Sequence, residues 1–171
     1  MAFAGFTKGL VGFAMPMIIF SSLTVLSNSE VALSLLIIPT LIANIVQAFQ
    51  DGINAAVKTV LKFKTFILIL AVSMIITTQV FYLVPTNLIS FLLGSVIVIY
   101  VLLELFKISV LNKVRVEGLY KSILALISGF CGGISGVWGP TTVIYLLNNN
   151  IQKSEIIRAQ GVIYGIGSIA L

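Results

Sequence analysis

Few side chains in this sequence are of a kind that does chemistry. The 171 residues include no histidine, one cysteine and five Asp and Glu residues in total. The absence of histidine excludes histidine-ligated metal sites, and a single cysteine excludes a thiol–disulfide relay, which needs two. No apolar stretch carries the paired carboxylates of general acid–base catalysis, and only Cys131 and scattered hydroxyls remain as nucleophiles. The sequence therefore predicts no enzyme, no metal and no cofactor.

The most distinctive feature is a segment with several glycines and a final proline, which occurs twice. Residues 5–16 read "GFTKGLVGFAMP" and residues 129–140 read "GFCGGISGVWGP". At a constant offset of 124 residues (129 − 5), the identical pairs are Gly5 and Gly129, Phe6 and Phe130, Gly9 and Gly133, Gly12 and Gly136, and Pro16 and Pro140. With one extra residue the match continues, since "SEVALS" at 29–34 corresponds to "SEIIRA" at 154–159. This self-similarity indicates an internal repeat.

The repeated segment has two interpretations, which do not exclude each other. Small residues four apart, such as Gly129 and Gly133, let helix backbones approach closely within a membrane. Alternatively, the glycines let the helix break and the proline starts a new one, because proline suits the first turn of a helix. Such a break leaves a half-helix N-terminus, whose N–H groups and dipole favour an anion. Corresponding breaks in two repeats are typical of a transporter's binding site.

Lys8 and Trp138 distinguish the two copies and complete the candidate site. Lys8 either extends to the cytoplasmic face or faces a cavity, where it would be the counter-charge of an anion. Trp138 stands beside the second break and not at a membrane interface. The predicted substrate-binding or pathway residues are Lys8, Gly9, Gly12, Pro16, Gly133, Gly136, Trp138, Pro140 and Thr141.

The elements that position these residues are predicted to be transmembrane helices. Hydrophobic residues make up 59% of the chain and charged residues 9%, whereas a soluble domain has about a quarter charged residues. Crossing the hydrocarbon core of a bilayer takes roughly twenty apolar residues. The apolar stretches are 9–29, 31–49, 65–83, 88–106, 122–147 and one from about 156 to 171. We therefore predict an all-α integral membrane protein with about six transmembrane helices in a lipid bilayer and no nucleic-acid partner.

The basic residues predict the orientation. Seven of the ten Lys and Arg residues lie in or beside two alternate loops, and they are Lys58, Lys62, Lys64, Lys107, Lys113, Arg115 and Lys121. The intervening loops "SNSE" and "VPTN" have none, and "NNNIQKSE" has one. By the positive-inside rule, the N-terminus and the loops 50–64 and 107–121 are expected in the cytoplasm. The loop "NNNIQKSE" is then expected on the outer side, together with Arg158.

The repeat also predicts the domain organisation. We expect one transmembrane transporter domain over 1–171, with repeat one at about 1–108 and an incomplete repeat two at about 119–171. Comparison of the copies leads us to expect about ten further residues in front and two further spans behind in the complete protein. Four spans per repeat would give both copies the same orientation, whereas re-entrant glycine segments would invert them. The sequence leaves both arrangements open.

At the two segments the chain resembles the sulfite exporter TauE/SafE permease family, which has a twice-occurring glycine-rich segment that ends in proline. The resemblance covers essentially all 171 residues in the order of the spans. It implies a multi-pass secondary transporter of a bacterial-type plasma membrane, which moves small anions by alternating access. The implied substrates contain sulfur, such as sulfite or organosulfonates. The alternative is a membrane structural or assembly subunit, in which the motifs serve only helix packing; the oligomeric state is not determined.

Overall fold

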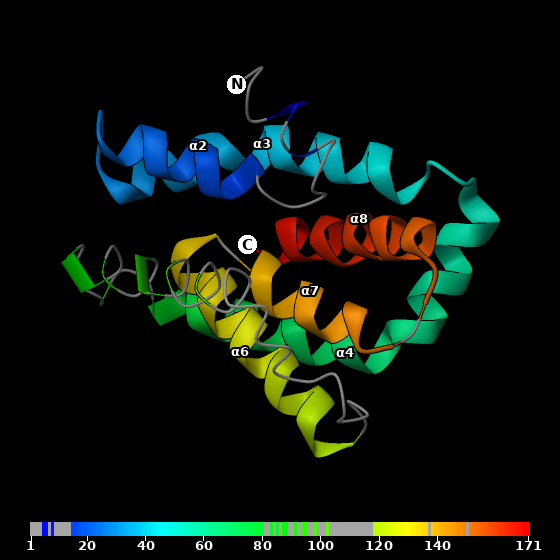
Figure 1. Ribbon diagram of the computed structural model, residues 1–171. Helices are drawn as coiled ribbons and strands as arrows, with labels where there is room; N and C mark the ends of the chain where they lie inside the picture. Colours follow the sequence, from blue (N-terminus) through cyan, green and yellow to red (C-terminus); the bar gives the residue numbers. More distant parts are fainter. Residues whose placement is uncertain are drawn as a thin grey trace.

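The computed structural model is all-helical in the residues that it describes. These are residues 15–80, 118–136, 138–149 and 151–171, with the separate positions 5, 6, 8, 83, 85, 87, 88, 91, 94, 95, 98 and 102. The helices of this part are α2 (Met15–Thr24), α3 (Ser29–Ala48), α4 (Ile53–Val80), α6 (Leu119–Ser135), α7 (Gly139–Leu147) and α8 (Lys153–Ala170) (Figure 1). The prediction of an all-α chain is confirmed for these residues.

Two parts of the chain share one design, in which a short helix with proline as its second residue is followed by a long helix. The short helices are α2, with 10 residues, and α7, with 9 residues. Pro16 and Pro140 are the second residues of these helices, a position where a missing N–H costs little. The long helices that follow are α3 and α8. Asn28 starts α3, because its side-chain oxygen accepts the N–H of Val31 at 3.0 Å.

α3 and α8 lie side by side and run in opposite directions (Figure 1). Near the end of α3, the Gln47 side chain donates to the carbonyl of Ile157 at 2.9 Å, close to the start of α8. One turn further along α8, Gly161 lies against the backbone of α3. A Cβ atom there would be only 2.4 Å from the nitrogen of Ala48. The absence of a side chain at Gly161 therefore allows the two backbones to approach.

α4 and α6 form the second close pair and run in the same direction. A Cβ atom at Gly129 would lie 2.4 Å from the carbonyl oxygen of Leu70, and one at Gly133 would lie 2.8 Å from that of Met74. Each step of four residues along α6 therefore matches a step of four along α4. The packing interpretation of Gly129 and Gly133 is confirmed at this contact.

The turns before α4 and before α8 lie at the same end of the assembly, because two ion pairs beside them join α4 and the turn before it to α8. Lys62 of α4 contacts Glu155 of α8 at 2.6 Å, and Arg158 of α8 contacts Asp51 of the turn before α4 at 2.5 Å. The expectation that these two loops lie on opposite sides of the membrane is therefore wrong. That expectation depends on the small number of basic residues in "NNNIQKSE" and on a single membrane crossing over residues 122–147.

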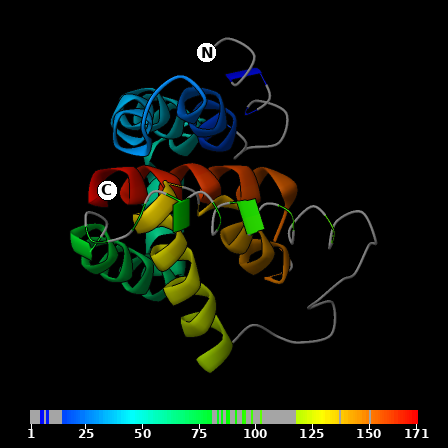
Figure 2. The same ribbon diagram turned by 90° about the vertical axis from the view of Figure 1, so that its left-hand side faces the viewer.

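The chain reverses between α6 and α7, so residues 122–147 do not form a single span (Figures 1 and 2). Gly133 in α6 lies at the level of Met74 in α4. Twelve residues later the ring of Tyr145 in α7 stacks on that of Phe66, with centroids 4.0 Å apart. α7 therefore returns toward the start of α4, which brings the next turn to the same end.

The lengths of the helices differ from the predicted spans. By length and composition, α4 is the one helix of the described part that is long and apolar enough to cross a membrane, and the stretches Ser34–Ala48 and Leu119–Ile134 are shorter apolar helices. α4 begins at Ile53, so most of the predicted loop 50–64 is helical, because its alanine, lysine and leucine residues favour a helix. Of the predicted span 9–29, residues 9–14 lie outside the described part and the rest forms the short α2 and the turn before α3; 88–106 lies outside the described residues except at single positions.

Gly161→Ala should lower the melting temperature of the detergent-solubilised protein, because its new methyl group has to displace the α3 backbone. Overpacking of this kind costs about 1–3 kcal/mol. Gly165→Ala on the same helix is the matched control, since its Cβ would lie 3.8 Å from that of Asn44, an ordinary contact. Thermal unfolding followed by circular dichroism measures both. Equal melting temperatures for the two variants would contradict the close approach of α3 and α8.

Single cysteines at Gln50 and Gln152 should react with a membrane-impermeant maleimide from the same side of oriented vesicles. Both positions are exposed, and they belong to the two turns that the ion pairs hold together. The background is Cys131→Ser, which removes the only native cysteine. Leu26→Cys, at the other end of α3, should react from the opposite side. Labelling of Gln50 and Gln152 positions from opposite sides would show that the chain does not reverse between α6 and α7.

Candidate functional site

The second glycine segment forms a break between two helices, as one interpretation of the sequence predicts. α6 ends at Gly136, whose φ of 66° is a left-handed conformation that glycine adopts without steric cost. Trp138 then precedes α7, and no side chain caps the start of that helix. The first N–H groups of α7 therefore have neither intrahelical partners nor a cap. This is the half-helix N-terminus expected from Gly136 and Pro140.

Trp138 fills the inside of this break. Its side chain is 2% exposed, and its ring lies edge-on to that of Tyr164, with the centroids 6.2 Å apart. Gly132 and Gly167 leave the space for it, because a Cβ atom at either glycine would come within 3.1 Å of the indole. Trp138 therefore packs the start of α7 against both α6 and α8.

Two sets of hydrogen bonds that share Tyr164 connect the first segment with the start of α7. The Nζ of Lys8 donates to the side-chain oxygen of Asn44, and the amide nitrogen of Asn44 donates to Ser168 Oγ at 3.1 Å. Ser168 Oγ donates to the carbonyl of Tyr164 at 2.8 Å, and the Tyr164 hydroxyl donates to the carbonyl of Gly139 at 3.1 Å. We call Lys8, Asn44, Ser168, Tyr164 and Gly139 the polar chain.

Lys8 is buried and has no carboxylate partner among the described side chains. It is 5% exposed, and besides Asn44 its Nζ lies 6.0 Å from the centroid of the Tyr164 ring. Asp51 and Glu155 are paired with other cations at the opposite end of α8. Of the two predicted placements of Lys8, extension to the membrane face is therefore wrong, and the side chain points into the protein. An amide oxygen and an aromatic face compensate its charge only in part.

The other predicted site residues divide between the break and the helix contacts. Pro140 is buried at the start of α7, and the Thr141 hydroxyl accepts a hydrogen bond from Ser128 at 2.6 Å. Gly133 packs against α4 and not against the polar chain. Pro16 is placed by the backbone of α2 alone. Gly9 and Gly12 lie outside the described residues.

Three side chains of the polar chain are not among the residues predicted from the sequence, and they are Asn44, Tyr164 and Ser168. A signal was present, since Gln160, Tyr164 and Ser168 are spaced four apart and share one face of α8. All three are buried.

Three further buried oxygens have no hydrogen-bond partner in the described structure. They are the hydroxyl of Thr40, on the same face of α3 as Asn44 and one turn away, and the amide oxygens of Gln47 and Gln160. Because buried polar atoms usually have partners, these three mark polar surface that the described residues leave unused.

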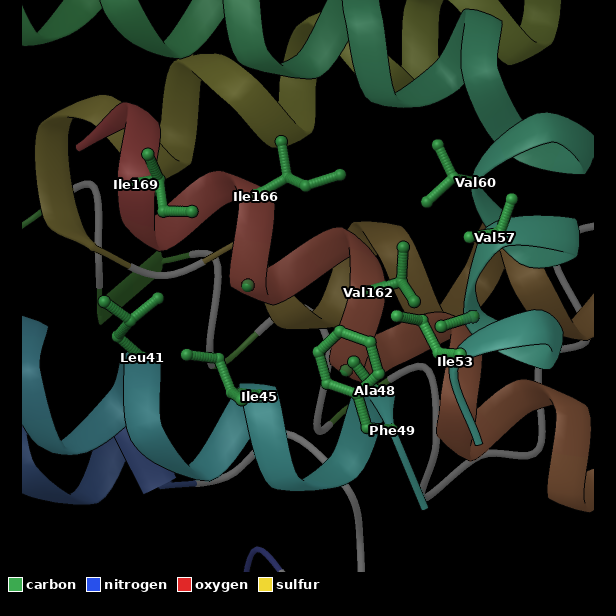
Figure 3. Close-up of a pocket in the computed structure, with 13 residues that line it drawn as sticks. Leu41, Ile45, Ala48, Phe49, Ile53, Val57, Val60, Val162, Ile166 and Ile169 are labelled. Carbon is green, nitrogen blue, oxygen red and sulfur yellow. The ribbon is translucent and has the colours of Figure 1, made fainter. Parts of the chain in front are cut away.

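A groove between α3, α4 and α8 is apolar, in contrast to the polar chain. It measures about 320 Å³ and is lined by aliphatic side chains, phenylalanine and glycine (Figure 3). Figure 3 shows Ile45 and Phe49 of α3 facing Val162 of α8, and Ile53 of α4 beside them. A lining without a polar group offers nothing to an anion, so this groove is not the candidate site.

Tyr164→Phe should loosen the start of α7, because it removes the hydroxyl that donates to Gly139 but keeps the ring against Trp138. The loss of one buried hydrogen bond costs about 1 kcal/mol. Trp138 is the only tryptophan, so its fluorescence reports this place, and we expect a red-shifted emission that acrylamide quenches more strongly. Tyr120→Phe, at an exposed tyrosine of α6, is the control. Identical emission in both variants would show that the hydroxyl does not hold α7.

Comparison with known proteins agrees with the architecture. A family model described as sulfite exporter TauE/SafE matches residues 1–171. The comparisons found no match among curated proteins or solved structures. Members of this family are integral membrane transporters and not enzymes, which confirms the resemblance noted at the two segments. The chain belongs to the sulfite exporter TauE/SafE family of membrane transporters.

Proposed function

We propose that this protein is a secondary transporter that binds small anions between Lys8 and the start of α7. The observation that carries the proposal is the buried ammonium of Lys8, which has no carboxylate partner among the described side chains. A lysine in the membrane interior costs roughly 3 kcal/mol. A bound anion recovers part of that cost, because it supplies the missing opposite charge in a medium of low dielectric constant.

The start of α7 favours a ligand of the same sign. The N-terminus of a helix carries partial positive charge and presents free N–H groups. Tyr164 connects it to Lys8: its backbone carbonyl accepts the last bond of the series from Lys8, and its hydroxyl donates to Gly139 at the first turn of α7. The two positive features are therefore linked through one residue of α8. The hydroxyls of Thr141 and Ser128, which are bonded to each other at 2.6 Å, add neutral polar groups beside it.

The arrangement of the repeats supports transport by alternating access. The alignment of 29–34 with 154–159 makes α3 and α8 equivalent, and these helices run antiparallel. Corresponding helices that run antiparallel are expected when two repeats have inverted orientation. In this arrangement α2 and α7 are re-entrant half-helices. The polar chain has members in both repeats, 1–108 and 119–171. A movement of one repeat against the other would therefore open the site to either side of the membrane.

The substrate class follows from the family and from the donors. The family is described by sulfite export, and sulfite or an organosulfonate accepts several hydrogen bonds at once. Lys8 supplies three N–H donors, and the helix N-terminus supplies backbone donors. We assign the protein to a bacterial-type plasma membrane. The paired ends of α4 and α8 lie at the cytoplasmic face in this proposal, because Lys58, Lys62 and Lys64 there satisfy the positive-inside rule. A re-entrant α2 begins and ends its segment at the outer face, so the cytoplasmic N-terminus predicted from the sequence is not part of this proposal.

A structural or assembly subunit is the second candidate. The close approaches at Gly129, Gly133 and Gly161 favour it, since they show that these glycines serve helix packing. Packing alone gives no reason for a buried ammonium, because an aliphatic residue would fill the same space without the cost of burial. Measurement of flux distinguishes the two functions.

Lys8→Gln should lower the uptake of radiolabelled sulfite into proteoliposomes by about tenfold or more, because it removes the counter-charge of the anion. Lys58→Gln is the control, since Lys58 is an exposed lysine of α4. The full chain is reconstituted, and folding is checked by size-exclusion chromatography. Transport by the wild type with an unchanged rate in Lys8→Gln would remove Lys8 from the site. Wild-type protein that carries neither sulfite nor a sulfonate would favour the structural function.

A further inference from the structure

The side chain of Asn44 occupies the position next to Lys8 where an anion would bind. Asn44 is fully buried in α3, and its carboxamide oxygen accepts a hydrogen bond from Lys8 Nζ. It is the one hydrogen-bonding partner that the structure gives this ammonium among the described residues. An amide oxygen carries a partial negative charge, so it is a weaker partner for an ammonium than an oxyanion would be.

The orientation of the Asn44 amide is determined by α8. Ser168 Oγ donates its proton to the carbonyl of Tyr164 at 2.8 Å, so toward Asn44 it acts as an acceptor. The amide nitrogen of Asn44 must therefore face Ser168, and the oxygen must face Lys8. Through this arrangement, a residue of repeat two determines which atom of Asn44 meets the lysine of repeat one.

We propose that Asn44 takes the place of the substrate in the empty site, and that an oxyanion displaces its amide oxygen from Lys8. This inference rests on the proposed function. The displaced amide turns away from Lys8, and this rotation breaks its bond to Ser168 Oγ. Occupation of the site thereby breaks a connection between the two repeats, α3 to α8, and Asn44 links binding to their relative movement.

The proposal assigns opposite effects to two substitutions at one position. Asn44→Asp puts a full negative charge against Lys8, which forms an internal ion pair that competes with the substrate. Asn44→Leu has nearly the same shape but no hydrogen-bond acceptor. The substrate then does not have to break a bond between Lys8 and residue 44 before it binds, so its affinity should rise. A role of Asn44 in packing alone predicts no such opposition.

The experiment measures the melting temperature of the full chain in detergent as a function of sulfite, with sodium chloride at equal ionic strength as the reference. A ligand that binds the folded state raises the melting temperature by an amount that follows its affinity. Asn44→Asp should be at least as stable as the wild type without sulfite, and its half-effective sulfite concentration should be about tenfold higher. Asn44→Leu should be less stable without sulfite, with a half-effective concentration about threefold lower.

Asn148→Asp is the matched control, because it adds the same charge to a half-buried asparagine that bonds only within α7 in the described structure, at 2.8 Å to the carbonyl of Ile144. Its response to sulfite should equal that of the wild type. Ser168→Ala, which releases the amide of Asn44, should reduce the transport rate more than the sulfite affinity, and Ser168→Thr should restore the rate.

The outcomes separate this inference from the proposed function. A wild type that sulfite and methanesulfonate fail to stabilise overturns both proposals. A wild type that responds while Asn44→Asp keeps its affinity overturns the role of Asn44 alone. The same holds if Asn44→Asp and Asn44→Leu change the affinity in the same direction.

Discussion

Backbone polar groups between apolar helices need partners inside the protein, and the reversal between α6 and α7 is where the described chain meets that constraint. Within a membrane, non-helical backbone is tolerated only where protein or a water-filled cavity surrounds it. Here Trp138 covers the reversal from within, and the Tyr164 hydroxyl bonds the Gly139 carbonyl. α8, which carries Tyr164, therefore helps to cover the break.

The same constraint explains why small residues are common in the helices around the break. Gly132 and Gly167 leave the volume that the indole of Trp138 takes, whereas Gly129 and Gly133 bring α6 against α4. The two interpretations of the repeated segment therefore apply to different glycines. Gly136 forms the break, and the earlier glycines hold α6 close enough to α4 for the break to be covered.

The sequence predicted features that depend on neighbouring residues, and it did not predict contacts between residues far apart in the chain. The break at Gly136 and the helix start at Pro140 were predictable because they follow from local backbone preferences. The roles of Asn44 and Ser168 were not, because they are 124 residues apart and meet only through the antiparallel contact of α3 and α8. The side of the loop before α8 was predicted wrongly, since charge counting along the chain assumes that every apolar stretch crosses the membrane.

The sequence by itself determined the class of the molecule, since so few charged residues cannot coat a soluble domain of this size. It also pointed to the family, which the family model shows, and it located the two segments where the helices start anew. Only the tertiary structure decided the direction of α7, the burial of Lys8 and its partner Asn44. The reason is physical: the environment of a charge depends on which helices surround it, and those helices are distant in the chain and adjacent only in the fold.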